Sequence, residues 1–305
     1  HSVSGGSGFD DISLIDASGN SVDLDGVEFV LGSAGDDILT VTDGTSVTLD
    51  GGDGADTLTG NVGADTLLGG SGSDTLIGGG GSDVVDGGEG SDLLELDGSA
   101  GVTGEGGDGT DTVVLVGETN EASLSGVEVV VGSAGDDSVT VSTNDIEAIS
   151  GGEGFDDVTL TDASGNTVDL AGVEVITGSA GDDTLTVTDD TSVTLDGGDG
   201  ADTLIGNVGD DTLFGGLGSD TLFGGGGSDF VDGGQDDDLL ELDGSAGVTA
   251  EGGDGTDTVV LVGETNEASL SGVEVVTGSA GDDSLTVSTN DIEAISGGEG
   301  FDDVT

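Results

Sequence analysis

The stretch from Gly51 to Glu95 reads GGDGADTLT GNVGADTLL GGSGSDTLI GGGGSDVVD GGEGSDLLE, five uninterrupted copies of one nine-residue phrase. Its consensus is GGxGxDxUx, where U is a large aliphatic residue. Each phrase ends in three residues such as Thr57–Thr59, which predict a short β-strand. Side chains alternate along a strand, so the residue at position eight faces inward. The phrase therefore predicts stacked strands around a thin core built from Leu58, Leu67, Leu76, Val85 and Leu94.

The same phrase recurs along the whole chain at spacings close to multiples of nine residues. Its copies begin at Gly5, Gly32, Gly51, Gly60, Gly69, Gly78, Gly87, Gly106, Gly132, Gly151, Gly178, Gly197, Gly206, Gly215, Gly224, Gly233, Gly252, Gly278 and Gly297. If nine residues make one half-turn, every interruption preserves the phase. The spacing predicts an all-β fold, a right-handed parallel β-roll or β-helix solenoid of about 16–17 turns.

A longer repeat lies above the short one. Phe9-Asp10-Asp11 recurs at Phe155-Asp156-Asp157 and at Phe301-Asp302-Asp303, and residues 9–154 differ from 155–300 at 22 of 146 positions. We interpret residues 1–8 as the edge of a preceding unit, 9–154 and 155–300 as two β-roll units, and 301–305 as the start of a third. The even number of half-turns in a unit predicts one continuous solenoid. Because the sequence starts and stops at nearly the same phase of the unit, we expect it to be an excerpt of a longer array.

The composition requires an external cation. The chain has 66 Asp and Glu, no Lys or Arg, and 66 Gly, which gives a formal charge of −66. Such a charge opposes compaction through self-repulsion. The chain has no basic surface for nucleic acid, and its apolar runs are too short for direct membrane insertion.

Calcium is the cation that the phrase favours. Glycine allows the turn to bend and to expose backbone carbonyl oxygens, and the Asp at position six adds a carboxylate. Calcium accepts six to eight such oxygens at flexible geometry, whereas magnesium requires a strict octahedron. Zinc and copper prefer His and Cys ligands, and the chain has one His and no Cys.

These repeats resemble the RTX, or hemolysin-type calcium-binding, nonapeptide-repeat family over essentially the full chain. The resemblance implies carboxylate ligands at Asp10, Asp37, Asp56, Asp65, Asp74, Asp83, Asp92, Asp111, Asp137, Asp156, Asp183, Asp202, Asp211, Asp220, Asp229, Asp238, Asp257, Asp283 and Asp302. It also implies backbone carbonyl ligands near Gly52, Gly54, Gly63, Gly70, Gly72, Gly79, Gly81, Gly88, Gly90, Gly198, Gly200, Gly209, Gly216, Gly218, Gly225 and Gly227. In that family each ion lies between two turns on the same side, which predicts about 12 inter-turn Ca²⁺ sites here.

One phrase departs from the consensus at its fourth residue. Gly233–Glu241 reads GGQDDDLLE, so Asp236 stands where the other phrases have glycine. If this position needs a positive φ, Asp adopts it more readily than most residues. We therefore expect a distorted site there and not a lost one.

Three outward positions become aromatic in the second unit. Leu68, Ile77 and Val84 are replaced by Phe214, Phe223 and Phe230. Harmless exposure is one interpretation. The other is a patch for self-association into a filament or lattice, in which the half-turn count places Phe214 and Phe230 on one face.

The sequence favours a structural function. We expect a calcium-binding segment of a secreted or bacterial cell-surface protein, such as an adhesin stalk, a surface-layer subunit or a filament, that folds on binding external calcium. Similarity to the RTX family implies export by type I secretion. The alternative is a binding module for carbohydrate, ice or a surface matrix, and a non-catalytic module of a secreted enzyme is less favoured. We do not expect catalysis, because no Lys, Arg, Tyr or Cys is present to act as a nucleophile or to stabilise an anion.

Overall fold

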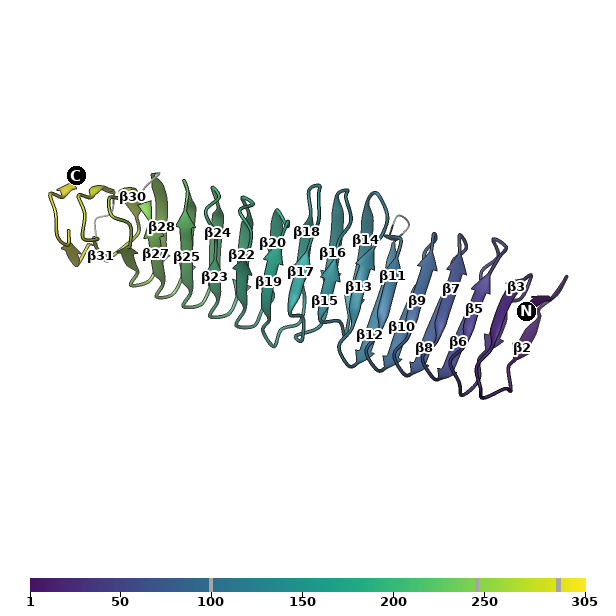
Figure 1. Ribbon diagram of the computed structural model, residues 1–305. Helices are drawn as coiled ribbons and strands as arrows, with labels where there is room; N and C mark the ends of the chain where they lie inside the picture. Colours follow the sequence, from purple (N-terminus) through teal and green to yellow (C-terminus); the bar gives the residue numbers. More distant parts are fainter. Residues whose placement is uncertain (99–100, 245–246, 289–291) are drawn as a thin grey trace. The chain divides into compact units, whose positions relative to one another are not determined.

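The regular structure consists of β-strands joined by tight turns (Figure 1). The computed structural model describes residues 1–98, 101–244, 247–288 and 292–305, and no α-helix occurs within them. The chain divides into two compact units, His1–Asp157 (unit 1) and Val158–Thr305 (unit 2). A search of the described residues for a helix able to span a membrane finds none.

In unit 1 the strands alternate between two parallel sheets. The odd-numbered strands form sheet A: β1 (Ser2–Ser4), β3 (Ser21–Asp25), β5 (Ile38–Val41), β7 (Thr57–Asn61), β9 (Thr75–Gly79), β11 (Leu93–Leu96), β13 (Thr112–Leu115), β15 (Val129–Val131) and β17 (Ala148–Ser150). The even-numbered strands form sheet B: β2 (Asp11–Ser13), β4 (Phe29–Leu31), β6 (Thr48–Asp53), β8 (Thr66–Ser71), β10 (Val84–Glu89), β12 (Val102–Asp108), β14 (Asn120–Ser125) and β16 (Asp137–Val141).

Unit 2 repeats this arrangement. Its sheet A contains β19 (Thr167–Ala171), β21 (Thr184–Val187), β23 (Thr203–Ile205), β25 (Thr221–Gly226), β27 (Leu239–Asp243), β29 (Thr258–Leu261), β31 (Val275–Thr277) and β33 (Ala294–Ser296). Its sheet B contains β18 (Asp157–Leu160), β20 (Val175–Thr177), β22 (Thr194–Asp199), β24 (Thr212–Leu217), β26 (Phe230–Gln235), β28 (Val248–Asp254), β30 (Glu267–Ser271), β32 (Ser284–Val287) and β34 (Asp303–Val304).

Each strand pairs with the strand two places along the chain, which is the mark of a solenoid. In unit 1, Thr57 lies opposite Thr75, and Thr66 lies opposite Val84. The offset is 18 residues in both cases, so two phrases make one turn. The predicted all-β parallel solenoid of about 16 turns is thereby confirmed. Its right-handed sense stays a prediction.

The core is the thin aliphatic stack that the phrase predicts. Burial alternates along the strands, and the position-eight residues Leu58, Leu67, Leu76, Val85 and Leu94 are at most 1% exposed. Several strands extend beyond the three predicted residues, because the first glycines of the next phrase continue the ladder, as in β6 and β8. A two-sheet core of this width buries little apolar area per residue, so turn chemistry contributes much of the stability.

Candidate metal centres

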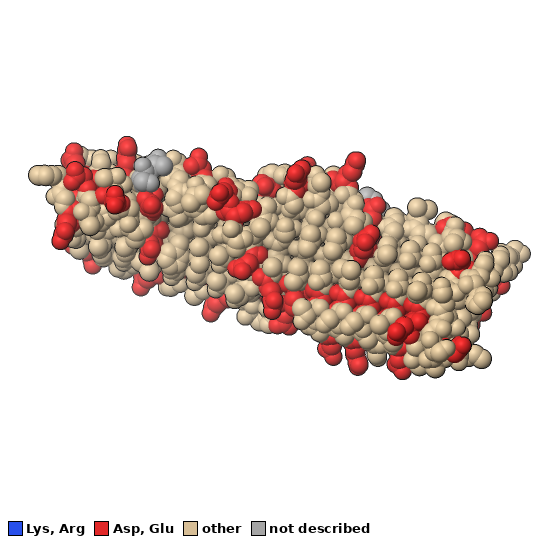
Figure 2. All heavy atoms as spheres, in the orientation of Figure 1, with Lys and Arg blue, Asp and Glu red and all other residues tan. Residues whose placement is uncertain are grey.

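The position-six aspartates stand in rows, each one residue before a strand except Asp137, which is the first residue of β16. In unit 1 the row ahead of sheet A contains Asp37, Asp56, Asp74, Asp92 and Asp111, and the row ahead of sheet B contains Asp10, Asp65, Asp83, Asp137 and Asp156. In unit 2 the corresponding rows are Asp183, Asp202, Asp220, Asp238 and Asp257, and Asp211, Asp229, Asp283 and Asp302. Figure 2 shows acidic side chains in a continuous row along one edge of unit 1. The structure thus brings the predicted ligands together on two sides of each unit.

Hydrogen bonds join the members of a row. The backbone N–H of Asp56 donates to Oδ1 of Asp74 over 2.7 Å, and the N–H of Asp74 donates to Oδ1 of Asp92 over 2.7 Å. On the other side, Asp65 N–H donates to Oδ1 of Asp83 over 2.9 Å. Each carboxylate therefore accepts from the turn before it, and the rows are continuous ladders of buried carboxylates.

The second carboxylate oxygen divides the ladders into two classes. In the first class the turn has glycine at position two, and Oδ2 is buried with no hydrogen-bond partner within the described part of the chain. This class includes Asp10, Asp56, Asp74, Asp83, Asp92, Asp111, Asp202, Asp220, Asp229, Asp238 and Asp257. Burial of a charged oxygen without a partner costs several kcal/mol, so these atoms call for a cation.

The second class has Ser or Asn at position two, and its Oδ2 accepts the backbone N–H of that residue. The donor–acceptor distances run from 2.6 to 2.9 Å for Ser33 to Asp37, Asn61 to Asp65, Ser133 to Asp137, Ser179 to Asp183, Asn207 to Asp211 and Ser279 to Asp283. We call these six turns self-capped, and the others glycine turns. The predicted ligands are therefore not equivalent.

The backbone explains the difference. In a glycine turn, positions two and four both have positive φ, for example 109° at Gly70 and 138° at Gly72. A Cβ at Gly70 would stand 2.1 Å from the carbonyl oxygen of Gly52 in the turn before, so only glycine fits. In the self-capped turns, neither position has positive φ, and the Asn61 side chain accepts the N–H of Gly63 over 2.5 Å.

The expectation that glycine lets each turn bend therefore holds in two different ways, because only the glycine turns use positive φ. Gly63 and Gly209, near which carbonyl ligands were predicted, lie in self-capped turns and do not have positive φ; their role as ligands stays a prediction. The physical reason is that Ser and Asn carry a Cβ, which disfavours positive φ, and a side-chain oxygen that holds the alternative turn.

The free oxygens of a glycine turn form a small cradle. The position at which a Cβ of Gly51 would stand lies 2.3 Å from Oδ2 of Asp56 and 2.6 Å from the carbonyl oxygen of Gly69 in the next turn. Equivalent pairs of oxygens lie beside Gly69, Gly87, Gly197 and Gly215, and also beside Gly60 and Gly206 of the self-capped turns, where Oδ2 already accepts a backbone N–H. A carboxylate and carbonyls of neighbouring turns thus face one spot, which is the donor set that calcium prefers. Within the described residues no three acidic or imidazole groups converge, so carbonyls would supply most ligands.

Burial raises the pKa of aspartates in the glycine turns, and it also raises the pKa of Asp65 in a self-capped turn. Burial raises the pKa of Asp202 and Asp238 to about 7, and it raises the pKa of Asp56 and Asp220 to about 6. Burial also pushes up the pKa of Asp283 in a self-capped turn, but the donors of Asn266 and Ser279 outweigh it and leave that pKa below its usual value. A buried carboxylate is stabilised as an anion only where donors or a cation meet both oxygens.

Three glutamates that the phrase does not contain continue the ladders. Asp10, Asp111 and Asp257 donate their backbone N–H to Oε2 of Glu28, Glu128 and Glu274 over 2.6 to 2.8 Å. Each glutamate directly precedes a strand, as the aspartates do. The sequence signal was the segment GVE before a valine-rich strand, one turn after a glycine turn.

The irregular turn at Asp236 keeps its place in the ladder. Asp236 has φ 74°, the one positive φ of a non-glycine residue in the described chain, and the equivalent Gly218 has φ 119°. Asp220 still donates its N–H to Oδ1 of Asp238 over 2.8 Å. The hydrogen bond from Gly218 to the Gln235 carbonyl lengthens to 3.2 Å, compared with 2.7 Å for Gly200 to Leu217. The turn is distorted and not lost.

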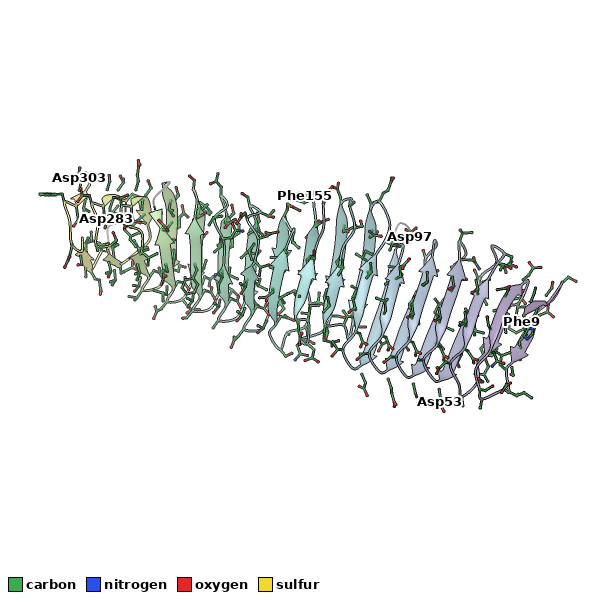
Figure 3. All side chains as sticks on the ribbon, viewed as in Figure 1. Phe9, Asp53, Asp97, Phe155, Asp283 and Asp303 are labelled. Atoms are coloured by element: carbon green, nitrogen blue, oxygen red, sulfur yellow. The ribbon has the colours of Figure 1, made fainter. Side chains whose placement is uncertain are left out.

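The aromatic positions divide between the two sheets. Phe214 and Phe230 lie on neighbouring strands β24 and β26, with ring centroids 5.9 Å apart. Phe223 lies in β25 of sheet A, so the three predicted residues do not form one patch. Strongly exposed phenylalanines occur instead at position five, among them Phe9 and Phe155 (Figure 3).

Comparison with known proteins agrees with the repeat pattern. The family described as RTX calcium-binding nonapeptide repeat (4 copies) matches residues 48–76, 59–94, 170–190, 194–222 and 205–240. Among solved structures, the chain is similar to a hyperactive, Ca²⁺-dependent, β-helical antifreeze protein from an Antarctic bacterium, with 21% identity and a TM-score of 0.26. That match covers 98% of this chain and 86% of the other. No curated protein matches the chain.

Proposed function

Because this chain carries RTX calcium-binding nonapeptide repeats, we propose that it is a calcium-stiffened structural segment of a secreted or cell-surface protein. The observation that supports this most is the class of buried aspartate oxygens without a donor, which includes Asp56, Asp74 and Asp92. They recur in a chain that has no Lys or Arg to neutralise them. Cation sites that repeat along a ladder favour a structural role over the binding of a single ligand in one pocket.

Each predicted inter-turn calcium site contains at least one glycine turn. Twelve inter-turn sites were expected, six in each long repeat, and the later turn of each pair is a glycine turn in all cases. Twelve calcium ions carry +24, which against −66 leaves −42. The loaded segment thus remains strongly acidic, which favours solubility and mutual repulsion over collapse.

Calcium would also set where the chain folds. Binding free energy is folding free energy when the site does not exist in the unfolded chain. Cytosolic calcium is scarce, so we propose that folding waits until the chain meets external calcium, in keeping with type I secretion. The carboxylates and carbonyls of the glycine turns would hold the ion, and the ion would supply charge neutralisation and cross-linking between turns. No catalytic function is proposed.

A second candidate is binding of a flat ligand, such as a carbohydrate, ice or a surface matrix. It is favoured by a column of four threonines in sheet A of unit 2, where Thr167, Thr184, Thr203 and Thr221 lie opposite one another in successive strands. Replacing Thr184 and Thr203 by Val would abolish ligand binding on this reading and leave calcium-dependent folding unchanged. Unaltered binding would argue against this face.

The proposed function is tested by circular dichroism and calcium counting on the full chain. We expect β-structure to appear as free Ca²⁺ rises to the millimolar range, to disappear with chelator, and to respond far less to Mg²⁺. Equilibrium dialysis with metal analysis should give about 12 ions per chain. A chain that folds equally without calcium, or binds none, would overturn the proposal. Electron microscopy of the native protein would then distinguish stalk, lattice and filament.

A further inference from the structure

Six carboxylate ladders begin with a self-capped turn, and the ladder from Asp10 to Glu28 begins with a glycine turn at the start of the described chain. Asp37 opens the ladder ahead of sheet A in unit 1, and glycine turns follow it at Asp56, Asp74, Asp92 and Asp111. The same order holds for Asp65 before Asp83, Asp183 before Asp202, and Asp211 before Asp229. Asp137 and Asp283 also stand directly before a glycine turn.

The first carboxylate is stabilised as an anion by donors from the chain itself. Oδ1 of Asp37 accepts the backbone N–H and the side-chain Nδ2 of Asn20 over 2.6 and 2.7 Å. Its Oδ2 accepts the N–H and Oγ–H of Ser33 over 2.6 and 3.0 Å. Four donors on one carboxylate leave little electrostatic reason for a cation.

This pattern is repeated wherever the turn reads GSAGDD. Asn120 and Ser133 surround Asp137, and Asn166 and Ser179 surround Asp183. Asn266 and Ser279 surround Asp283 in the same way. The GNVG turns use a smaller set, in which Oδ1 of Asp65 accepts the N–H of Val47 and Oδ2 accepts that of Asn61.

We infer that the self-capped turns are calcium-independent starter turns, from which the calcium-dependent part of each ladder assembles. The inference rests on the proposed calcium function and adds a direction to it. A starter turn presents an ordered strand end and ordered backbone groups to the glycine turn that follows. Because the starter turn is already ordered, the first cation has to order only one of the two turns that bind it. The entropic cost of closing the loop at the beginning of a ladder is therefore smaller.

Hydrogen–deuterium exchange of the full chain across a series of free Ca²⁺ concentrations tests the inference. Peptides that cover residues 32–37 and 178–183 should keep protection after calcium removal at least about tenfold above peptides that cover 69–74 and 87–92. Loss of protection in both classes at the same free calcium and to the same extent would overturn it. If the glycine turns show no calcium dependence, the proposed function itself fails, so the two failures are distinguishable.

A matched pair of substitutions separates the turn conformation from the mere presence of a hydroxyl. Ser33→Ala keeps the Cβ and the backbone donor to Asp37, so residues 32–37 should stay protected without calcium. Ser33→Gly gives this turn the GG sequence that has positive φ elsewhere, and its protection should become calcium-dependent. The unchanged Ser179 turn provides the reference within the same molecule. Equal behaviour of the two variants would contradict the inference.

Discussion

Replacing Asp220 by Asn should stabilise the calcium-free chain locally and weaken the calcium-loaded one. Oδ1 of Asp220 accepts the N–H of Asp202 over 2.8 Å, and its Oδ2 is buried without a donor. Oδ2 of Asp220 and the carbonyl oxygen of Gly233 both lie within 2.4 Å of the place for a Gly215 Cβ, so this buried spot is lined by two oxygens and holds one negative charge. The substitution therefore removes the buried charge and keeps an acceptor for the Asp202 N–H.

The magnitude follows from the electrostatics of this site. Burial raises the pKa of Asp220 from 3.8 to about 6. At roughly 1.4 kcal/mol for each pKa unit, the charged form costs about 3 kcal/mol at pH 7, and solvent screening at the turn reduces this to about 1–2 kcal/mol. Without calcium, removal of the charge should therefore lower the equilibrium constant for local opening of this turn by about 5- to 30-fold.

Asp183→Asn is the matched control, and its effect should have the opposite sign. Both oxygens of Asp183 accept donors, from Asn166 on one side and from Ser179 on the other. An amide must place its N–H groups against one of these donors, which costs about 1–3 kcal/mol whether or not calcium is present.

Amide exchange of Asp202 and Asn166, the donors to the two altered groups, measures both effects locally. A local measurement is needed because solenoids do not unfold as one unit. With calcium, Asp220→Asn should lose one bound ion and the protection that depends on it. Destabilisation of both variants by similar amounts in chelator would refute the division into two classes.

Four further predictions concern other parts of the structure. Asp236→Gly should relieve the positive φ of this residue and stabilise its turn by roughly 1 kcal/mol, seen as slower local exchange; an unchanged rate would show that the strain is absent. Calcium-free protein should have more β-structure by circular dichroism at pH 4.5 than at pH 7.5, because the pKa of groups such as Asp202 is raised in the fold to about 7 from 3.8. Their contribution is fully present below pH 3.8 and is lost as the pH rises through about 6 to 7, so a β signal that grows with pH would contradict it. Leu213→Ala, at a site 0% exposed, should cost about 2–5 kcal/mol and increase the free calcium required for folding; an unshifted calcium titration would show that this core does not couple to the sites. Replacing both Phe214 and Phe230 by Ser should abolish any lateral association detected by sedimentation and leave calcium-dependent folding intact, whereas unchanged assembly would exclude this pair as the contact.

The fold could be predicted because its two periods are visible in the sequence. The aliphatic residue at position eight determines which side of the strand faces the core, and a shift of one residue would expose every Leu in the stack. The spacing of the phrases also determines which aspartates share a side. Asp56 and Asp74 therefore fall in one row, and Asp65 falls in the other, as the half-turn count predicts.

The difference between the two kinds of turn could not be predicted from the phrase. Ser33 for glycine is a single conservative change in a motif that otherwise reads the same. The change alters the orientation of the peptide group at position two. In the Ser33 turn the N–H of this residue points to the carboxylate of Asp37. In the next turn Gly52 has a positive φ, and its N–H does not point to the carboxylate. That choice depends on the balance between a Cβ penalty and a local hydrogen bond, each about 1 kcal/mol. The spacing of residues contains no information about it.

The glutamates at the ends of the ladders could not be predicted from the phrase either, because they lie outside it. They show that the first and last turns of a ladder need different hydrogen-bond partners. Hydrogen bonds run in one direction, from each backbone N–H to the carboxylate of the following turn. A ladder therefore begins with a carboxylate that needs local donors, as Asp37 has in Asn20, and ends with an N–H that needs an acceptor. Asp111 finds its acceptor in Glu128 over 2.6 Å. As at the ends of a helix, unpaired groups at both termini require different caps. A ladder cut between Asp111 and Glu128 would leave a buried donor unpaired, so a stable fragment that contains this ladder must keep Asn20 and Glu128 together.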